Sequence, residues 1–316
     1  VSSFMQYGNV PTPHCIFQDC FKLKPGHFMA FNIEKDIDIE QLTPGHQKCY
    51  WNVYDSYNKP KLDLSFIEAK KQTEKILKSA CDYRMVSDVP VGVFLSGGYD
   101  SASVTALLQK DRITPLKTFT ISVPDLGLDE APFAKEIAAY LGTEHTEIQC
   151  NQKEAIDLIS ELPFYYDEPF ADSSAIPTTL VSLAARKHVT VALSADAGDE
   201  VFAGYNRYDY IQRYGEKLNK IPSFLRKSIV KGMEILPSNA IPYFRGTYNF
   251  HNRYEKIKGV LKNPTEEQIM ISLSEQFTDA QMRKIANYSY DKLKTAYASK
   301  ELKDEFSSPL SYMMAI

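Results

Sequence analysis

Six consecutive residues have the types and spacing needed to bind an anion: Ser96-Gly97-Gly98-Tyr99-Asp100-Ser101. An apolar run precedes them and an amphipathic stretch follows, as when a buried strand feeds a tight turn into a helix. At such a turn the unpaired N–H groups and the helix dipole favour phosphate, and the two glycines let the backbone approach it closely. Asp100 alone would repel phosphate, so its presence predicts a Mg²⁺ between carboxylate and phosphate oxygens. A glycine turn with Ser101 as helix N-cap is the purely structural alternative.

A second polar segment follows another apolar run. It reads Leu193-Ser194-Ala195-Asp196-Ala197-Gly198-Asp199-Glu200-Val201-Phe202-Ala203-Gly204-Tyr205. Three of its residues are acidic, and clustered carboxylates bind Mg²⁺ when they lie beside a phosphate loop. A solvated acidic loop is the alternative. No GxxxxGK[ST] motif is present, so γ-phosphate transfer of the kinase type is not indicated.

The elements that must position these loops alternate along the chain. We expect strands near residues 92–95, 116–123, 144–149 and 189–193. We expect helices near 63–83, 101–109, 130–141 and 153–162, and one through Leu180, Leu183 and Ala184. In the first helix the expected apolar stripe includes Phe66, Ile67, Ile76, Leu77 and Ala80; in the third it includes Phe133, Ile137, Ala138 and Leu141, with Gly142 ending the helix. This alternation predicts an α/β fold, a parallel sheet covered on both faces, with ligands beyond the carboxyl ends of its strands.

Outside this region the pattern changes. Short strand-like runs at 15–17, 20–23 and 28–31, separated by a Pro25-Gly26 turn, make residues 1–55 appear β-rich. Beyond Asn206 the sequence reads as helical and polar. The first residue is Val1, and the last residues lie in an apolar run, so we expect a fragment of a longer protein.

The composition of the chain limits the kinds of partner that it is expected to bind. The chain has 316 residues, 44% of them hydrophobic, and a formal net charge of −4, which gives no basic footprint for nucleic acid. No apolar run has the length of a membrane span. The five cysteines are widely spaced and odd in number, so a reduced, cytoplasmic chain is expected, with Cys15, Cys20 and Cys49 as small buried hydrophobes. The six histidines show no zinc-ligand spacing.

Together these segments resemble a known family. The first loop is similar to the SGGxDS pyrophosphate loop of the N-type ATP pyrophosphatases, and the second segment is similar to the LSGEGxDExFGGY block of glutamine-dependent asparagine synthetases. Further matches are the segments 87–92, 141–145 and 167–172, in the family's order. The resemblance implies a doubly wound parallel sheet of the adenine nucleotide α-hydrolase/PP-loop type. It further implies that residues 1–55 end a glutaminase domain and that 56–316 form a synthetase domain.

The resemblance also implies an activity. A ligase of this family joins AMP to a carboxylate and replaces it with ammonia from glutamine, releasing AMP and pyrophosphate; aspartate to asparagine is the default reaction. ATP and Mg²⁺ are the implied cofactors, a glutaminase domain is the implied partner, and a homodimer is compatible with the family. The implied nucleotide-binding residues are Leu95, Ser96, Gly97, Gly98, Asp100, Ser101, Ile121, Ser194 and Ala195. Asp100 and Asp199 are the implied metal ligands, and Asp196, Asp199 and Glu200 the implied catalytic residues.

Several features leave the acceptor open. Ala195-Asp196-Ala197 stands where the family has Gly-Glu-Gly, so the acid is one methylene shorter and glycine's backbone freedom is lost.

Val1 cannot serve as the glutaminase nucleophile, and a motif resembling YLPDDxLxKVDR would begin after Ile316. Amidation of another carboxylate, such as a sugar uronate in surface-polysaccharide synthesis, and a non-catalytic nucleotide-binding module are the alternatives. Asp167, Glu168 and Asp172 are candidates for substrate binding, and Tyr205 and Arg207 for contact with phosphate or a carboxylate.

Overall fold

The chain divides into two compact units in a computed structural model, which describes residues 1–32, 43–123, 129–236, 238–241, 250–286, 296 and 299–316. We call residues 60–167 and 172–198 the sheet unit, and residues 1–59, 168–171 and 199–316 the helical unit. These compact units do not test the functional division into 1–55 and 56–316, which stays a prediction.

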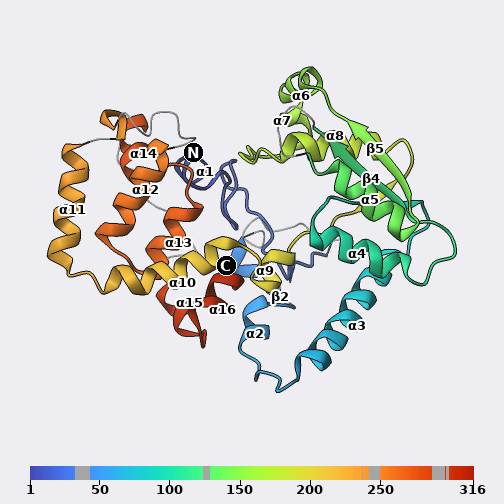
Figure 1. The fold of residues 1–316 in the computed structure, drawn as a ribbon, viewed down its shortest axis with the longest axis horizontal. Helices are drawn as coiled ribbons and strands as arrows, with labels where there is room; N and C mark the ends of the chain where they lie inside the picture. The colour runs from blue at the N-terminus through green and yellow to red at the C-terminus, as the bar shows by residue number, and fades with distance from the viewer. Residues whose placement is uncertain (33–42, 124–128, 237, 242–249, 287–295, 297–298) are drawn as a thin grey trace. The chain divides into compact units, whose positions relative to one another are not determined.

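A four-stranded parallel sheet forms the centre of the sheet unit. Its strands are β3 (Val91–Phe94), β4 (Lys117–Ser122), β5 (Glu144–Gln149) and β6 (Val191–Leu193). Their order is β5-β4-β3-β6, and β4 and β5 can be followed side by side in Figure 1. In register, Val93 lies opposite Thr118 on one side and Leu193 on the other.

Helices connect these strands in the predicted alternation. They are α3 (Phe66–Arg84), α4 (Tyr99–Gln109), α5 (Ala131–Leu141), α6 (Gln152–Ile159), α7 (Leu162–Tyr165) and α8 (Ala175–Ala185). The N-terminus of α3 has a capping box between Ser65 and Glu68, and α5 ends at Gly142, whose φ of 70° is left-handed as predicted.

Both faces of the sheet are covered, because neighbouring residues of a strand point to opposite sides. On one face Val93 packs with Cys81 of α3 and Leu108 of α4, and Leu95 packs with Ala134 and Ala138 of α5. On the other face Phe119 packs with Val181 and Ala185 of α8. The doubly wound α/β prediction is therefore confirmed.

The helical unit contains the rest of the chain. Its elements are α1 (Ser2–Tyr7), β1 (His27–Phe28), η2 (Pro44–His46), β2 (Lys48–Cys49), α2 (Val53–Tyr57), α9 (Gly198–Phe202, which begins in the sheet unit), α10 (Asn206–Asn219), α11 (Ser223–Ile235), η4 (Ser238–Ala240), α12 (Phe250–Lys262), α13 (Glu266–Ser274), α14 (Asp279–Ala286), α15 (Lys300–Asp304) and α16 (Pro309–Ala315). Its core joins Tyr208 and Ile211 of α10 to Met270 of α13 and Met313 of α16. The helical C-terminal region is as predicted.

Three expectations are wrong in detail. The described part of residues 1–55 is not β-rich: it contains two paired two-residue strands and one isolated bridge beside helices, and residues 33–42 lie outside the described residues. In α3, Phe66, Ile67 and Ile76 are exposed, because only one narrow stripe of this helix meets α4 and the sheet. Phe133 of α5 is 61% exposed for the same reason.

The cysteine prediction is corrected in part. All five cysteines are free thiols, but Cys20 and Cys49 are exposed and Cys15 is half-buried, whereas Cys81 and Cys150 are the buried ones. Cys49 lies in the two-residue strand β2, both of whose residues are exposed because β2 belongs to a two-stranded ladder rather than to a packed sheet. Within the described residues, no helix is both long and apolar enough to cross a membrane.

Candidate nucleotide and acid–base sites

Two serines build the first loop, between the end of β3 and the start of α4. The backbone N–H of Ser96 donates to Ser101 Oγ at 3.1 Å, and the two hydroxyls lie 2.8 Å apart. Ser96 Oγ also accepts from the Gly98 N–H at 3.2 Å. Because these bonds join the first and last residues of the predicted motif, they close the loop into a compact turn.

The start of α4 leaves backbone donors available. Gly98 is the N-cap and no side chain caps the helix, so the alternative in which Ser101 is the N-cap is wrong. To other described residues, the N–H groups of Tyr99, Asp100 and Ser101 make no recorded hydrogen bond. Unpaired donors at the N-terminus of an eleven-residue helix are a suitable site for an anion.

Close packing explains one glycine of this loop. A Cβ placed on Gly97 would lie 2.9 Å from Cβ of Phe133 and 3.4 Å from the carbonyl oxygen of Glu130, both at the start of α5. Since these are parts of a packed helix rather than a flexible side-chain end, the loop can lie here only with glycine at this position.

The second loop lies beside the first, because β6 pairs directly with β3. The backbone of Gly198 lies so close to Asp100 that a Cβ on this glycine would collide with both carboxylate oxygens. Thus the structure brings together Asp100 and the segment 194–198, two parts of the predicted site. Ser194 and Asp196 are exposed, and Ala195 is half-buried.

Ala197 takes an unusual backbone conformation. Its φ is 72°, in the left-handed region that glycine adopts most easily, and Ala203 shares this property with a φ of 55°. Ala197 is the position at which the resembled block has glycine. Alanine therefore adopts, at this position, a backbone conformation that is typical of glycine.

Leu95 and Ile121, implied to line an adenine pocket, have side chains on opposite faces of the sheet. Leu95 is 1% exposed and packs on α5, whereas Ile121 packs with the cluster on α8. Their side chains do not line one pocket. Nucleotide binding by these two residues, through their backbone groups, stays a prediction.

In the helical unit, Glu200 is held by Tyr205. The tyrosine hydroxyl donates to Glu200 Oε1 at 2.9 Å, and this hydrogen bond, followed by burial, raises the pKa of Tyr205 to about 12. Asp199 lies against Gly204, whose N–H donates to the Asp199 carbonyl at 2.9 Å. Glu200 therefore has an assigned partner within its own unit, which a solvated acidic loop does not predict.

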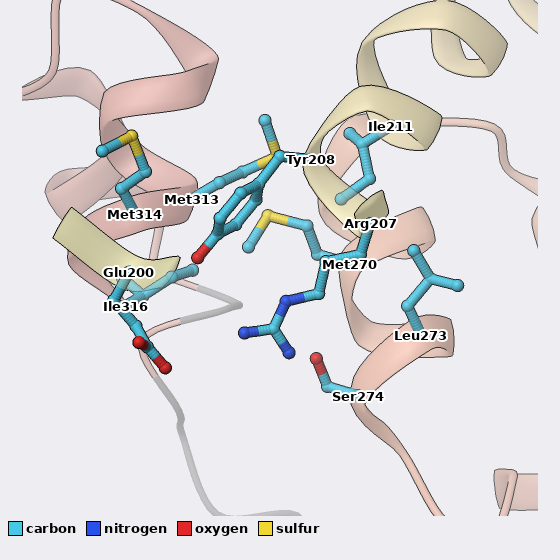
Figure 2. A pocket seen from close by; sticks show the side chains of 10 residues that line it. All are labelled: Glu200, Arg207, Tyr208, Ile211, Met270, Leu273, Ser274, Met313, Met314 and Ile316. Atoms are coloured by element: carbon cyan, nitrogen blue, oxygen red, sulfur yellow. The ribbon is translucent and has the colours of Figure 1, made fainter. Parts of the chain in front are cut away.

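A pocket of about 110 Å³ lies in the helical unit, with Glu200 and Arg207 in its wall. Figure 2 shows both side chains among those that line it. The other lining residues are Tyr208, Ile211, Met270, Leu273, Ser274, Met313, Met314 and Ile316. The Arg207 guanidinium lies 4.1 Å from the ring centre of Tyr205 and 5.5 Å from that of Tyr208. Sequence reasoning named Glu200 and Arg207 but missed the residues that α13 and α16 contribute, since no local motif joins these helices.

In the acidic segment before α8, Glu168 and Asp172 accept hydrogen bonds from nearby residues of the chain. Glu168 forms an ion pair with Lys22 and accepts the Ile16 N–H at 3.1 Å; although burial raises its pKa, the hydrogen bonds from Lys22, Cys15 and Ile16 outweigh this and lower it. Asp172 accepts the Ser174 N–H at 2.8 Å just before α8. Asp167 is exposed. These bonds do not test substrate binding by Asp167, Glu168 or Asp172, which stays a prediction.

Metal binding stays a prediction too. Among the residues that the structure describes, no group of three or more His, Cys, Asp or Glu side chains is placed to hold an ion by itself. Asp100 fits Mg²⁺ as one oxygen ligand, because it is exposed beside a loop whose free N–H groups suit phosphate. A Mg²⁺ that also uses phosphate oxygens needs few protein ligands.

The fold and the two loops define an α/β domain with a glycine-rich loop between a parallel strand and a helix N-terminus. The family model described as asparagine synthase matches residues 72–307. The chain belongs to the asparagine synthase family, and the resemblance inferred from its motifs is confirmed.

Relatives carry related names. A putative glutamine-hydrolysing asparagine synthetase 2 of Methanocaldococcus jannaschii is 37% identical over 236 residues, which are 72% of this chain and 42% of the relative. Asparagine synthetase 1 of Bacillus subtilis is 32% identical over 75% of this chain and 35% of its own length. The chain thus spans less than half the length of these relatives.

Among solved structures, an NH3-dependent NAD synthetase from Campylobacter jejuni, in complex with nitrate, is 15% identical. The match covers 73% of this chain and all of that one, with a TM-score of 0.29. This similarity is too low to support a statement about the present chain.

Proposed function

We propose that the protein of which these residues are part uses ATP to amidate a carboxylate, converting aspartate to asparagine with ammonia derived from glutamine. Membership of the asparagine synthase family and the names of its relatives support this proposal. The observation that carries it is the loop 96–101, with its free N–H groups and Asp100 beside Gly198.

Phosphate binding falls to the first loop. The serine pair holds the turn, while the N–H groups of Tyr99, Asp100 and Ser101 and the dipole of α4 favour the β- and γ-phosphates. This leaves the bond between the α- and β-phosphates as the one to be cleaved. Asp100, with Asp199 as the second predicted ligand, would hold Mg²⁺, which neutralises charge on the departing pyrophosphate.

The reaction has two balanced steps. A carboxylate oxygen of aspartate attacks the α-phosphorus, and the bond to the β-phosphate oxygen breaks, giving an acyl-adenylate and pyrophosphate. Ammonia then attacks the acyl carbon, the carbon–oxygen bond to AMP breaks, and one proton is lost from nitrogen to a base. We assign this proton to Asp196, an exposed carboxylate on the second loop, and the orientation of ammonia to Asp199 and Glu200.

The glutamine hydrolysis named in the relatives' titles is proposed here for the whole protein, through a glutaminase domain. The homodimer and the cytoplasmic location remain predictions. Amidation of a different carboxylate and nucleotide binding without catalysis are the outcomes that would replace the proposal.

Substitution of Asp100 tests the site in the whole protein. Asp100→Ala should lower aspartate-dependent pyrophosphate release at saturating ATP and Mg²⁺ by at least ~100-fold, which corresponds to about 2.7 kcal/mol of transition-state stabilisation. Asp111→Ala is a matched control, since Asp111 is an exposed aspartate at the other end of α4. Turnover near wild type in Asp100→Ala would refute the assignment.

Product analysis tests the chemistry. With ¹⁸O in the aspartate carboxylate, label should appear in AMP, because that oxygen stays on the leaving nucleotide. ADP and inorganic phosphate as the main products would instead indicate an acyl-phosphate route. Pyrophosphate release with a sugar uronate but not with aspartate would favour the alternative acceptor.

A further inference from the structure

The pocket of the helical unit presents two opposite charges between apolar walls. Arg207 at the start of α10, Glu200 on α9 and Ser274 at the end of α13 all line it, and Figure 2 shows their side chains. Methionine, leucine and isoleucine side chains form most of the remaining wall. A small charged pair in such surroundings is typical of a ligand site, where a few polar groups fix orientation.

The guanidinium of Arg207 is held in place but keeps its donors available. Its only recorded contacts with other described residues are with the ring faces of Tyr205 at 4.1 Å and Tyr208 at 5.5 Å. Stacking uses the face of the guanidinium and leaves the N–H groups at its edge available for a planar acceptor. A carboxylate is the acceptor that this fork fits with two hydrogen bonds.

Glu200 makes a simple anion a poor occupant. Its carboxylate lies in the pocket wall, where the hydroxyl of Tyr205 donates a hydrogen bond to Glu200 Oε1 at 2.9 Å. A ligand that carried only negative charge would be repelled by this carboxylate. A ligand that also carried an ammonium group would be attracted by it.

We propose that this pocket binds a small α-amino acid with an uncharged side chain. Its carboxylate would lie on Arg207 and Ser274, and its ammonium group on Glu200. The volume of about 110 Å³ and the methionine and leucine walls admit a hydrogen, methyl or hydroxymethyl side chain. A second carboxylate would be buried against those walls without a partner, which is costly.

The binding test uses isothermal titration calorimetry on the purified whole protein without ATP. Glycine and L-alanine should bind, while acetate and methylamine, each carrying half of the charge pair, should bind at least about tenfold more weakly. L-Aspartate should also bind more weakly than L-alanine. Binding of acetate as tight as that of L-alanine, or no binding of either amino acid at 10 mM (roughly 2.7 kcal/mol at 25 °C), would overturn the proposal.

Two substitutions of Arg207 test whether its charge and its forked geometry hold the ligand carboxylate. Arg207→Met should weaken L-alanine binding at least about tenfold, and Arg207→Lys should weaken it less, since the charge stays while the fork is lost. Arg213→Met is the control, because Arg213 lies on the same helix, is exposed and pairs with Asp209 at 2.6 Å. An equal loss in Arg213→Met and Arg207→Met would contradict the assignment.

Glu200→Gln gives a change of opposite sign for two ligands. It should weaken L-alanine binding and strengthen acetate binding, because the group that attracts ammonium is the one that repels acetate. A parallel loss for both ligands would mean a damaged pocket and would refute the proposed roles. These readouts are of binding alone, so they stand or fall separately from pyrophosphate release.

Discussion

Ala197 gives a sharp test of backbone strain in the second loop. With a φ of 72° it is a non-glycine residue in the left-handed region, and its side chain is exposed. For an L-residue this conformation costs roughly 1–2 kcal/mol. Ala197→Gly removes that cost but gives the unfolded chain extra freedom, worth about 0.4–1 kcal/mol. The net expectation is a stabilisation of about 0.5–1 kcal/mol.

The matched control is two residues away. Ala195 is not among the described residues with a positive φ, so Ala195→Gly should destabilise by about 0.4–1 kcal/mol through the unfolded chain alone, and by more through its half-buried methyl group. Ala203→Gly should gain less than Ala197→Gly, because Ala203 packs against the core of the helical unit.

Urea unfolding followed by circular dichroism measures these differences. Residues 195 and 197 both lie in the sheet unit, so their variants are compared with the wild-type protein in the same unfolding transition. The midpoint should rise for Ala197→Gly and fall for Ala195→Gly, with an unchanged slope. If Ala197→Gly lowers the midpoint as much as Ala195→Gly does, the strain argument is wrong.

Three further predictions follow. Gly198→Ala should push the Asp100 carboxylate aside and lower pyrophosphate release about tenfold at limiting Mg²⁺ without lowering the melting temperature; Gly232→Ala, where a Cβ meets nothing within 4 Å, is the control, and equal activity in both would contradict this contact. Burial lowers the pKa of His145; the charge of Glu147 opposes this effect and that of Lys135 adds to it. The stability that this neutral imidazole allows above about pH 6.5 should therefore be lost as pH falls through its folded pKa, by more than in His145→Asn; parallel pH curves in urea unfolding would refute this. Asp196→Glu should preserve or raise aspartate-dependent pyrophosphate release, since the side chain is exposed, and a clear loss would support a different acceptor.

The sheet unit was predictable because its signals are local. Segments with strand-like composition alternate with helical patterns, and a glycine ends α5 at the position where its φ of 70° is needed. The neighbourhood of the two loops followed from topology alone, since both come directly after parallel strands and such strands end at one edge. The pairing of β3 with β6 confirms that neighbourhood.

The exposure of helix side chains and the lining of the pocket depend on which helix surfaces pack together. A local sequence pattern does not contain this information. Ile76 and Phe133 have helical spacing relative to buried neighbours, yet they are exposed because the helices present only a narrow stripe to the sheet. The pocket joins Arg207, Met270 and Met313, which are far apart in sequence and meet only when α10, α13 and α16 pack together.

The second loop has a backbone conformation that suits glycine, although alanine occupies the position. Ala197 has left-handed backbone where the resembled block has glycine, and Gly198 lies against Asp100. If nothing depended on this conformation, a negative φ would be the cheaper one for alanine. The strained conformation of Ala197 comes directly after the exposed carboxylate of Asp196, on the loop that neighbours the loop 96–101. We therefore infer that the backbone path matters more here than residue type, which is the reason to expect catalysis to survive the change from Gly-Glu-Gly to Ala-Asp-Ala.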